Sequence, residues 1–332
     1  MIQVPLRGLD GRNLLAFLTA VGAQVALEQK LRGALLSWHP RTFRPTIFLP
    51  AGGGAAAVQA PPGIEDWLVS VLMSALEELA GGADRFHWDD IKVGTKGSRP
   101  RSRSEFRARA FVPSADMARQ QQGDRGRADF VAGLASDAGG SEKELGYTAL
   151  CVITGDSHQH FLGFMRDLRK QVTAEHLKNA LFAAWRYREQ GRSFRWDPTE
   201  DRRYALRASD PAKGRDKEIP AMWGANRLAF EALACLPCFP RGRRVRTTAF
   251  EDERIMRWPL WSPSIDLSTL RSLLAHPAVM RPEGMTLSRM GVFAVASSRR
   301  SSVGRKRTFG PTKLWPVPDV RHGSFGAEMR EE

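Results

Sequence analysis

Apolar residues recur at three- and four-residue intervals directly after a tight turn near the start of the chain. The turn is Gly8-Leu9-Asp10-Gly11, and Asn13 stands before the apolar run as a candidate helix N-cap. The spacing predicts an apolar helix within residues 8–28, formed around Leu14, Leu15, Phe17, Leu18, Val21, Val25 and Leu27. Such a helix needs a real core around it. Hydrophobic residues make up 42% of the 332 residues, which is enough for one large domain or two modest ones.

Patterns of both helices and strands follow this helix. Short strands are expected at 36–38, 46–49, 147–153 and 291–296. Helical periodicity predicts helices at 64–79, 161–168, 174–185, 224–235 and 267–274, with Thr173 and Asp266 as candidate caps. The small residues of 51–63 indicate a loop.

The order of these elements decides the fold class. Strands and helices do not alternate regularly, so the sequence predicts an α+β fold rather than a doubly wound α/β fold. We expect a mixed sheet with helices and long basic loops, and a helix-rich C-terminal half. A division into an N-terminal α+β region, 1–145, and a C-terminal α+β region, 146–332, fits the change in composition.

The charge balance points to a class of partner. Fifty Lys and Arg against thirty-six Asp and Glu give a net charge of +14. A polyanion would relieve the resulting self-repulsion, and nucleic acid is the commonest polyanion inside cells. A basic but otherwise ordinary enzyme is the alternative. The first nine residues lack a signal-peptide pattern, and no apolar run is long enough to span a bilayer. We therefore expect a cytoplasmic protein without a membrane partner.

The basic residues gather in three clusters that mix arginine with glycine or serine. The first is a predicted exposed loop at 94–109, with Lys96, Arg99, Arg101, Arg103, Arg107 and Arg109. The second holds Arg241, Arg243, Arg244 and Arg246, and the third holds Arg299, Arg300, Arg305, Lys306 and Arg307. Arginine forks match phosphate oxygens, and Phe309 beside the third cluster suits a stacked base. Each cluster alone is typical of a solvated surface, but three that converge would engage roughly six to ten phosphates.

Two further polar residues follow the Trp223-Gly224 turn. Asn226 and Arg227 are of the type that reads a base edge or a phosphate at a helix N-terminus, and a simply capped helix is the alternative. We expect Trp196, Trp258 and Trp261 to lie in the core.

Candidate catalytic groups are weaker. His158 and His160 alternate in a short segment and could serve a metal-independent ribonuclease, but a shared metal site lacks a clear third ligand. Asp197, Glu200 and Asp201 suggest a two-metal nuclease, although the arginines that follow favour ion pairs. The Cys235-Leu-Pro-Cys238 motif has no second pair and indicates structural thiols. We expect no enzyme activity, no metal and no cofactor.

Several tracts together resemble proteins encoded in type I-U (also called I-G) CRISPR loci. These tracts are Gly8-Leu-Asp-Gly-Arg-Asn-Leu-Leu-Ala-Phe-Leu-Thr-Ala-Val-Gly22, Thr154-Gly-Asp-Ser-His-Gln-His160, Trp196-Asp-Pro-Thr-Glu-Asp-Arg-Arg-Tyr-Ala-Leu-Arg207, Trp223-Gly-Ala-Asn-Arg-Leu-Ala-Phe-Glu231 and Arg257-Trp-Pro-Leu-Trp261. They are spread over nearly the whole chain, and the tract from 196 to 207 is the most specific.

The resemblance implies a non-catalytic subunit of the CRISPR RNA-guided surveillance complex (Cascade), which serves antiviral defence. The implied role is that of the large subunit, which recognises the short motif flanking the target and helps load the Cas helicase-nuclease. The implied partners are guide RNA, target double-stranded DNA and the other Cas subunits. A backbone or 5′-handle-capping subunit and a guide-processing endoribonuclease are the alternatives. In such complexes base pairing reads the target while protein reads shape and phosphate.

Overall fold

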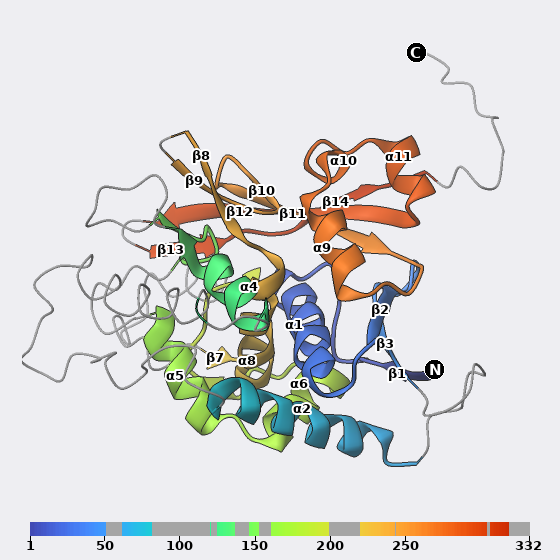
Figure 1. Cartoon of the computed structure of the whole chain (residues 1–332), viewed down its shortest axis with the longest axis vertical. Coiled ribbons are helices and arrows are strands. Elements are labelled where there is room, and N and C mark those ends of the chain that lie inside the picture. The colour runs from blue at the N-terminus through green and yellow to red at the C-terminus, as the bar shows by residue number, and fades with distance from the viewer. Residues whose placement is uncertain are drawn as a thin grey trace, which may run out of the picture.

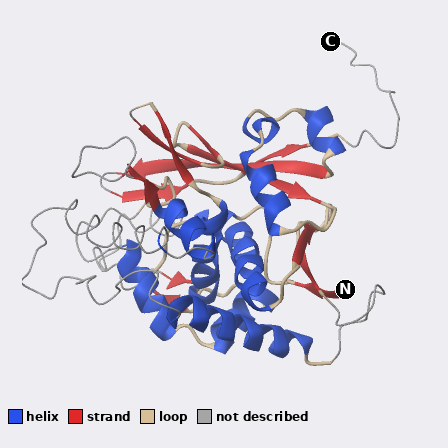
Figure 2. Cartoon of the chain, in the orientation of Figure 1, coloured by secondary structure: helices blue, strands red, loops and turns tan. Residues whose placement is uncertain are grey.

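The computed structural model describes residues 1–50, 62–81, 120, 125–136, 146–152, 161–198, 220–242, 244–303 and 306–318. In Figure 1 a layer of helices lies beneath an antiparallel sheet, and a smaller sheet closes one side near the N-terminus. Figure 2 shows the same division, with most helices gathered below the larger sheet. The predicted α+β class is confirmed.

The smaller sheet brings together three strands from the first fifty residues. Its order is β1 (Ile2–Pro5), β3 (Pro45–Leu49) and β2 (Leu35–Trp38), with antiparallel pairing throughout. The two strands predicted from the sequence are β2 and β3. An isolated bridge between Leu36 and Ile265 ties this sheet to the C-terminal half of the chain.

The helical layer is built around α1 (Leu14–Lys30) and α8 (Trp223–Glu231), which pack closely against each other. All residues of α1 from Leu14 to Leu27 are buried, and Asn13 caps the helix by accepting a hydrogen bond from the backbone N–H of Ala16 at 3.2 Å. Gly22 permits this close contact, because a Cβ at its position would overlap the carbonyl oxygen of Leu228. Around this pair lie α2 (Ile64–Gly81), α4 (Arg125–Leu134), α5 (Phe161–Gln171), α6 (Ala174–Phe182) and the 3₁₀ turn Ala232–Cys235.

The larger sheet has β12 (Val292–Val303) as its central strand. One stretch of β12 pairs with β11 (Ile255–Trp261), and β11 also pairs with the short β10 (Phe250–Glu251). Two later strands, β13 (Lys306–Phe309) and β14 (Lys313–Pro316), pair with successive stretches of β12. Between β11 and β12 the chain forms α9 (Leu267–Ala275), α10 (Pro277–Met280) and α11 (Gly284–Arg289).

Three two-stranded ladders complete the described chain. They are β4 (Ala135–Ser136) with β5 (Gly146–Tyr147), β6 (Glu189–Gln190) with β7 (Pro220–Ala221), and β8 (Cys238–Arg241) with β9 (Arg244–Thr247). The last of these is a hairpin that stands at one end of the larger sheet (Figure 1).

One hydrophobic cluster runs through both layers and includes residues from Val4 to Val317, on both sides of position 145. The predicted core tryptophans Trp196, Trp258 and Trp261 are fully buried. Their indole N–H groups donate to the backbone carbonyls of Leu150, Gly11 and Leu36, at 2.8–2.9 Å. These bonds satisfy the one polar atom that each ring brings into the core.

Two sequence predictions need correction. The strand expected at 147–153 is limited to Gly146–Tyr147, because Thr148 to Cys151 form a turn in which the Cys151 N–H donates to the Thr148 carbonyl. The helix expected at 174–185 ends at Phe182. A search of the described helices finds none long and apolar enough to cross a membrane.

Candidate nucleic-acid interface

The second basic cluster lies on the β8–β9 hairpin. Arg241 and Arg244 face each other across the end of this ladder, and both side chains are exposed. Gly242 adopts a φ of 61° in the connection between them, a conformation that favours glycine. Arg246 is less exposed and forms an ion pair with Asp252 at 3.3 Å. Arg243 lies outside the described residues.

The third cluster begins on the central strand of the larger sheet. Arg299 is exposed, whereas Arg300 is half-buried and donates to the backbone carbonyl of Ala149 at 2.9 Å. Lys306 and Arg307 occupy β13 opposite Val303 and Ser302. Arg305 falls outside the described part of the chain. Arg300 therefore has a structural contact inside the chain, and Arg299 is the cation of this strand that faces solvent.

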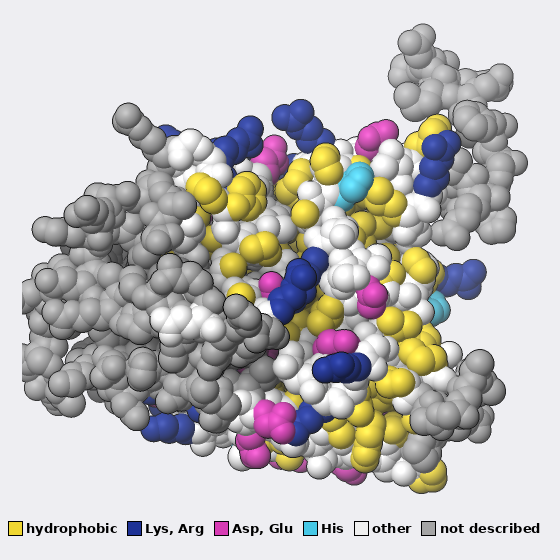
Figure 3. All heavy atoms as spheres, viewed as in Figure 1, with side chains coloured by type: hydrophobic (Ala, Val, Ile, Leu, Met, Phe, Trp, Pro, Cys, Tyr) yellow, Lys and Arg dark blue, Asp and Glu magenta, His cyan; other side chains and the backbone are white. Residues whose placement is uncertain are grey.

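The two clusters meet at the turn between β10 and β11. Strand register places Arg299 opposite Ile255, and the Arg300 N–H donates to the carbonyl of Arg254. Asp252, in the same turn, holds Arg246 of the hairpin. We define the basic sheet end as Arg241, Arg244, Arg246, Arg254 and Arg299. Basic side chains project along the corresponding upper edge of the molecule in Figure 3.

Four of these arginines have no carboxylate partner among the described residues. Arg241, Arg244, Arg254 and Arg299 are exposed and form no ion pair with a described acid. Exposed guanidinium groups without an internal partner remain free to fork onto phosphate oxygens. Arg254 was missed by sequence reasoning because it stands alone among acids, in Glu251-Asp-Glu-Arg254.

An aromatic-walled hollow of about 220 Å³ opens beside the hairpin. Phe239 is 45% exposed on β8 and forms part of the wall with Phe250 and Met280. The polar part of the lining is Arg241, Arg246, Arg281, Glu251 and Asp252. An exposed ring beside several arginines suits a stacked base next to a held phosphate. Sequence reasoning missed Phe239, and nothing in the sequence placed Arg281 there.

The expectation for Asn226 and Arg227 is wrong, because α8 buries both side chains. Asn226 accepts a hydrogen bond from the Phe194 N–H and donates to the Met222 carbonyl, at 3.0 and 2.9 Å. Arg227 is 3% exposed and pairs with the equally buried Glu231 at 2.7 Å. Their polar groups are used inside the core, so neither can reach a nucleic acid at this surface.

The remaining sequence candidates divide into described and undescribed residues. The whole first cluster, Lys96 to Arg109, lies outside the described residues, as do His158, His160, Glu200 and Asp201. Asp197 is fully buried and accepts hydrogen bonds from Asn13 and Tyr187. Among the residues that the structure describes, no three His, Cys, Asp or Glu side chains are grouped to hold a metal ion.

The two cysteines of the Cys235-Leu-Pro-Cys238 motif are unreactive thiols. Burial raises the pKa of Cys235 to about 11 and that of Cys238 to about 12. A redox or metal-binding cysteine requires the opposite shift, because the thiolate is the reactive form. Both residues are free cysteines.

Two comparisons of this sequence with known proteins gave no match. No protein-family model matches the sequence, and a search of curated proteins gives no significant match.

Proposed function

We propose that this protein binds the nucleic-acid backbone through the basic sheet end, as a non-catalytic subunit of a type I CRISPR surveillance complex. The observation that carries the binding proposal is the convergence of two clusters, 241–246 and 299–307, at the β10–β11 turn. These clusters are more than fifty residues apart in the sequence. A merely solvated surface gives no reason for arginines from three separate segments, none paired with a described acid, to gather there.

The chemistry of the surface favours phosphate over base edges. Backbone hydrogen bonds join the strands and the turn that carry these arginines, so their backbone positions are held at fixed spacing and the guanidinium groups can follow a sugar-phosphate chain without reading its sequence. Phe239 offers one stacking surface beside them. This fits a subunit that holds guide RNA or target double-stranded DNA while base pairing supplies the specificity.

The place in the complex rests on the resemblance of the tracts described above. Within that proposal the subunit is large-subunit-like: it recognises the motif that flanks the target and helps recruit the Cas helicase-nuclease. The predicted loop at 94–109 would capture the duplex, and the cluster at 299–307 would be the fixed contact.

The binding proposal is tested by fluorescence anisotropy with labelled single-stranded RNA and duplex DNA over a range of salt concentrations. The variant is R241A/R244A/R299A, and the matched control R32A/R41A/R289A removes three exposed arginines elsewhere. We expect the first variant to lose at least tenfold in affinity at about 100 mM salt. Its slope of log K against log salt should fall by up to about 2.7 on duplex DNA, since each lost phosphate contact removes about 0.9. Equal affinities for the variant and the control would refute the proposal.

The complex and the alternative activity are tested separately. Expression with the neighbouring Cas proteins should bring down the complex and its guide RNA with this chain, and the absence of both would contradict the subunit role. Incubation with labelled repeat RNA in EDTA tests the endoribonuclease alternative. Cleavage that is lost in H158A or H160A would replace the non-catalytic role with that one.

A further inference from the structure

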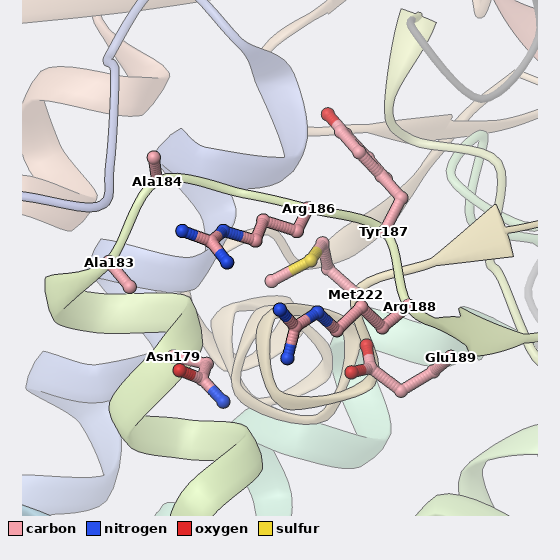
Figure 4. A pocket seen from close by; sticks show the side chains of 8 residues that line it. All are labelled: Asn179, Ala183, Ala184, Arg186, Tyr187, Arg188, Glu189 and Met222. Carbon is pink, nitrogen blue, oxygen red and sulfur yellow. The ribbon is translucent and has the colours of Figure 1, made fainter.

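A second hollow, of about 270 Å³, lies between the end of α6 and the start of α8, away from the basic sheet end. Its wall is Asn179, Ala183, Ala184, Arg186, Tyr187, Arg188, Glu189 and Met222. Figure 4 shows the side chains of Arg186 and Arg188 extending past the Met222 side chain toward the side on which Asn179 lies. Neither arginine belongs to the three clusters found in the sequence.

The backbone that presents these arginines is held in a strained conformation. Tyr187, between them, has a φ of 51°, which is unfavourable for an aromatic residue. Its side chain points away from the two guanidinium groups (Figure 4), and its hydroxyl donates to the buried carboxylate of Asp197 at 2.7 Å. Just before it, the Trp185 indole N–H donates to the Ala180 carbonyl at 2.9 Å. Side chains at and just before the strained residue thus hold it in place, and such strain is found most often at ligand sites.

The charges around the hollow suit an anion. Arg186 and Arg188 are exposed and form no ion pair with any acid that the structure describes. Glu189 is the acid in the wall, and its Oε2 accepts the backbone N–H of Trp223, in the first turn of α8, at 3.0 Å. That carboxylate therefore already serves as an acceptor for the helix N-terminus. Glu189 thus offsets the positive end of the α8 dipole, and Arg186 and Arg188 are the two cations of the wall.

The size of the hollow limits what can enter it. A volume of about 270 Å³ is far too small for a nucleic-acid duplex. The lining is also partly apolar, through Ala183, Ala184 and Met222, so it offers a surface for a sugar or base beside the cationic one. A bare inorganic anion would leave that apolar surface unused.

We propose that this hollow binds one nucleotide unit, with its phosphate held by Arg186 and Arg188. The unit is either a free mononucleotide or the phosphorylated end of a strand. The inference does not rest on the function proposed for the basic sheet end, and it would stand if that surface bound nothing.

Isothermal titration calorimetry of the full chain with adenosine 5′-monophosphate, adenosine and inorganic phosphate tests the site. Wild type should bind the monophosphate more tightly than either of the other two. R186A/R188A should weaken that binding at least tenfold, whereas the charge-matched R32A/R289A should leave it unchanged. Thermal unfolding of each variant shows whether the fold is kept, and R186K/R188K, which retains charge but lacks the forks, should give an intermediate loss.

Three outcomes would overturn the inference: no binding of the monophosphate by wild type, binding of adenosine or inorganic phosphate as tightly as the monophosphate, or an equal loss in R186A/R188A and its control. A short RNA with and without a 5′-phosphate then distinguishes the two sources. Tighter binding of the phosphorylated strand than of the same strand without the phosphate, with the difference lost in R186A/R188A, identifies a strand end, and equal binding of the two strands identifies a free nucleotide.

Discussion

The side-chain amide of Asn13 donates to Oδ1 of Asp197 at 2.9 Å and joins residues that are 184 positions apart. The same Asn13 accepts the Ala16 N–H at the start of α1, and the same Asp197 accepts the Tyr187 hydroxyl at 2.7 Å. One buried carboxylate thus links the cap of the central helix to the strained loop beside the nucleotide-sized hollow.

Replacing Asp197 by alanine should therefore destabilise the protein. The substitution removes the carboxylate that accepts from the half-buried Asn13 amide and the half-buried Tyr187 hydroxyl, and the loss of these two hydrogen bonds to a charged group should cost about 1–3 kcal/mol. Urea unfolding followed by circular dichroism measures the loss. D252N, at a carboxylate whose side chain is 79% exposed and whose backbone φ of 48° suits asparagine, is the control and should change the free energy of unfolding by less than about 1 kcal/mol.

Gly22→Ala should also destabilise, although alanine is the better helix former. The added methyl group would overlap the carbonyl oxygen of Leu228 and force α1 and α8 apart. Overpacking of this kind costs about 1–3 kcal/mol, more than the roughly 0.5–1 kcal/mol that alanine gains in a helix. Ser74→Ala, at an exposed position of α2, is the matched control. A G22A protein as stable as wild type in urea would contradict the tight packing of the two helices.

Breaking the buried pair between Arg227 and Glu231 should cost more than breaking a partly exposed pair. Glu231→Gln removes the carboxylate that pairs with the buried Arg227 charge, and breaking a buried pair in this way typically costs about 3–5 kcal/mol. The comparison is Glu251→Gln, which removes the partner of Arg257 in a pair with side chains 22% and 43% exposed, and should cost about 1 kcal/mol or less. The denaturant midpoints of the two variants measure these two costs, and similar midpoints would refute the burial argument.

Glu253 and Asp266 should make opposite contributions to the pH dependence of stability. Burial raises the pKa of Glu253 above its ordinary 4.5, so its contribution is fully present at low pH and is lost as pH rises through the raised pKa. The backbone N–H of Thr269 lowers the pKa of Asp266 below its ordinary 3.8, so its contribution is present near neutral pH and is lost on acidification.

Unfolding in urea from about pH 3 to pH 7 measures both effects against uncharged variants. Wild type should lose stability relative to E253Q as pH rises, and should gain stability relative to D266N. A difference of the same sign in the two comparisons would contradict one of these assignments.

Local patterns were enough to predict several elements of this fold. The helices α1, α2, α8 and α9 start within one residue of their predicted positions, because an apolar face repeats along each one and because Asn13 and Asp266 supply caps. Caps and periodicity are properties of a few neighbouring residues, so they can be read without knowing the fold.

Strand β11 escaped prediction for a physical reason. Pro259 lacks an N–H and argues against a strand with partners on both edges. The structure accommodates Pro259 because β10 is short. It pairs only with Ile255 and Met256, so β10 needs no N–H from Pro259.

The direction of a side chain was harder to predict than its chemistry. Asn226 and Arg227 have the donors that read nucleic acid, but α8 is buried on every side. The spacing of Arg227 and Glu231, four residues apart on a helix, was the available signal that the cation already has a partner. Arg254 and Arg186 contribute to candidate sites only through the fold, because neither lies in one of the three basic clusters.

The all-round burial of α1 has a consequence for the chain as it leaves the ribosome. Thr19 of this helix donates to the carbonyl of Ala225, a residue made 206 positions later. At about 5–20 residues per second, α1 would remain without its main partner for roughly ten to forty seconds. During that time an entire apolar helix is open to chaperones and to neighbouring nascent chains, so slower elongation before α8 should lower the yield of folded protein.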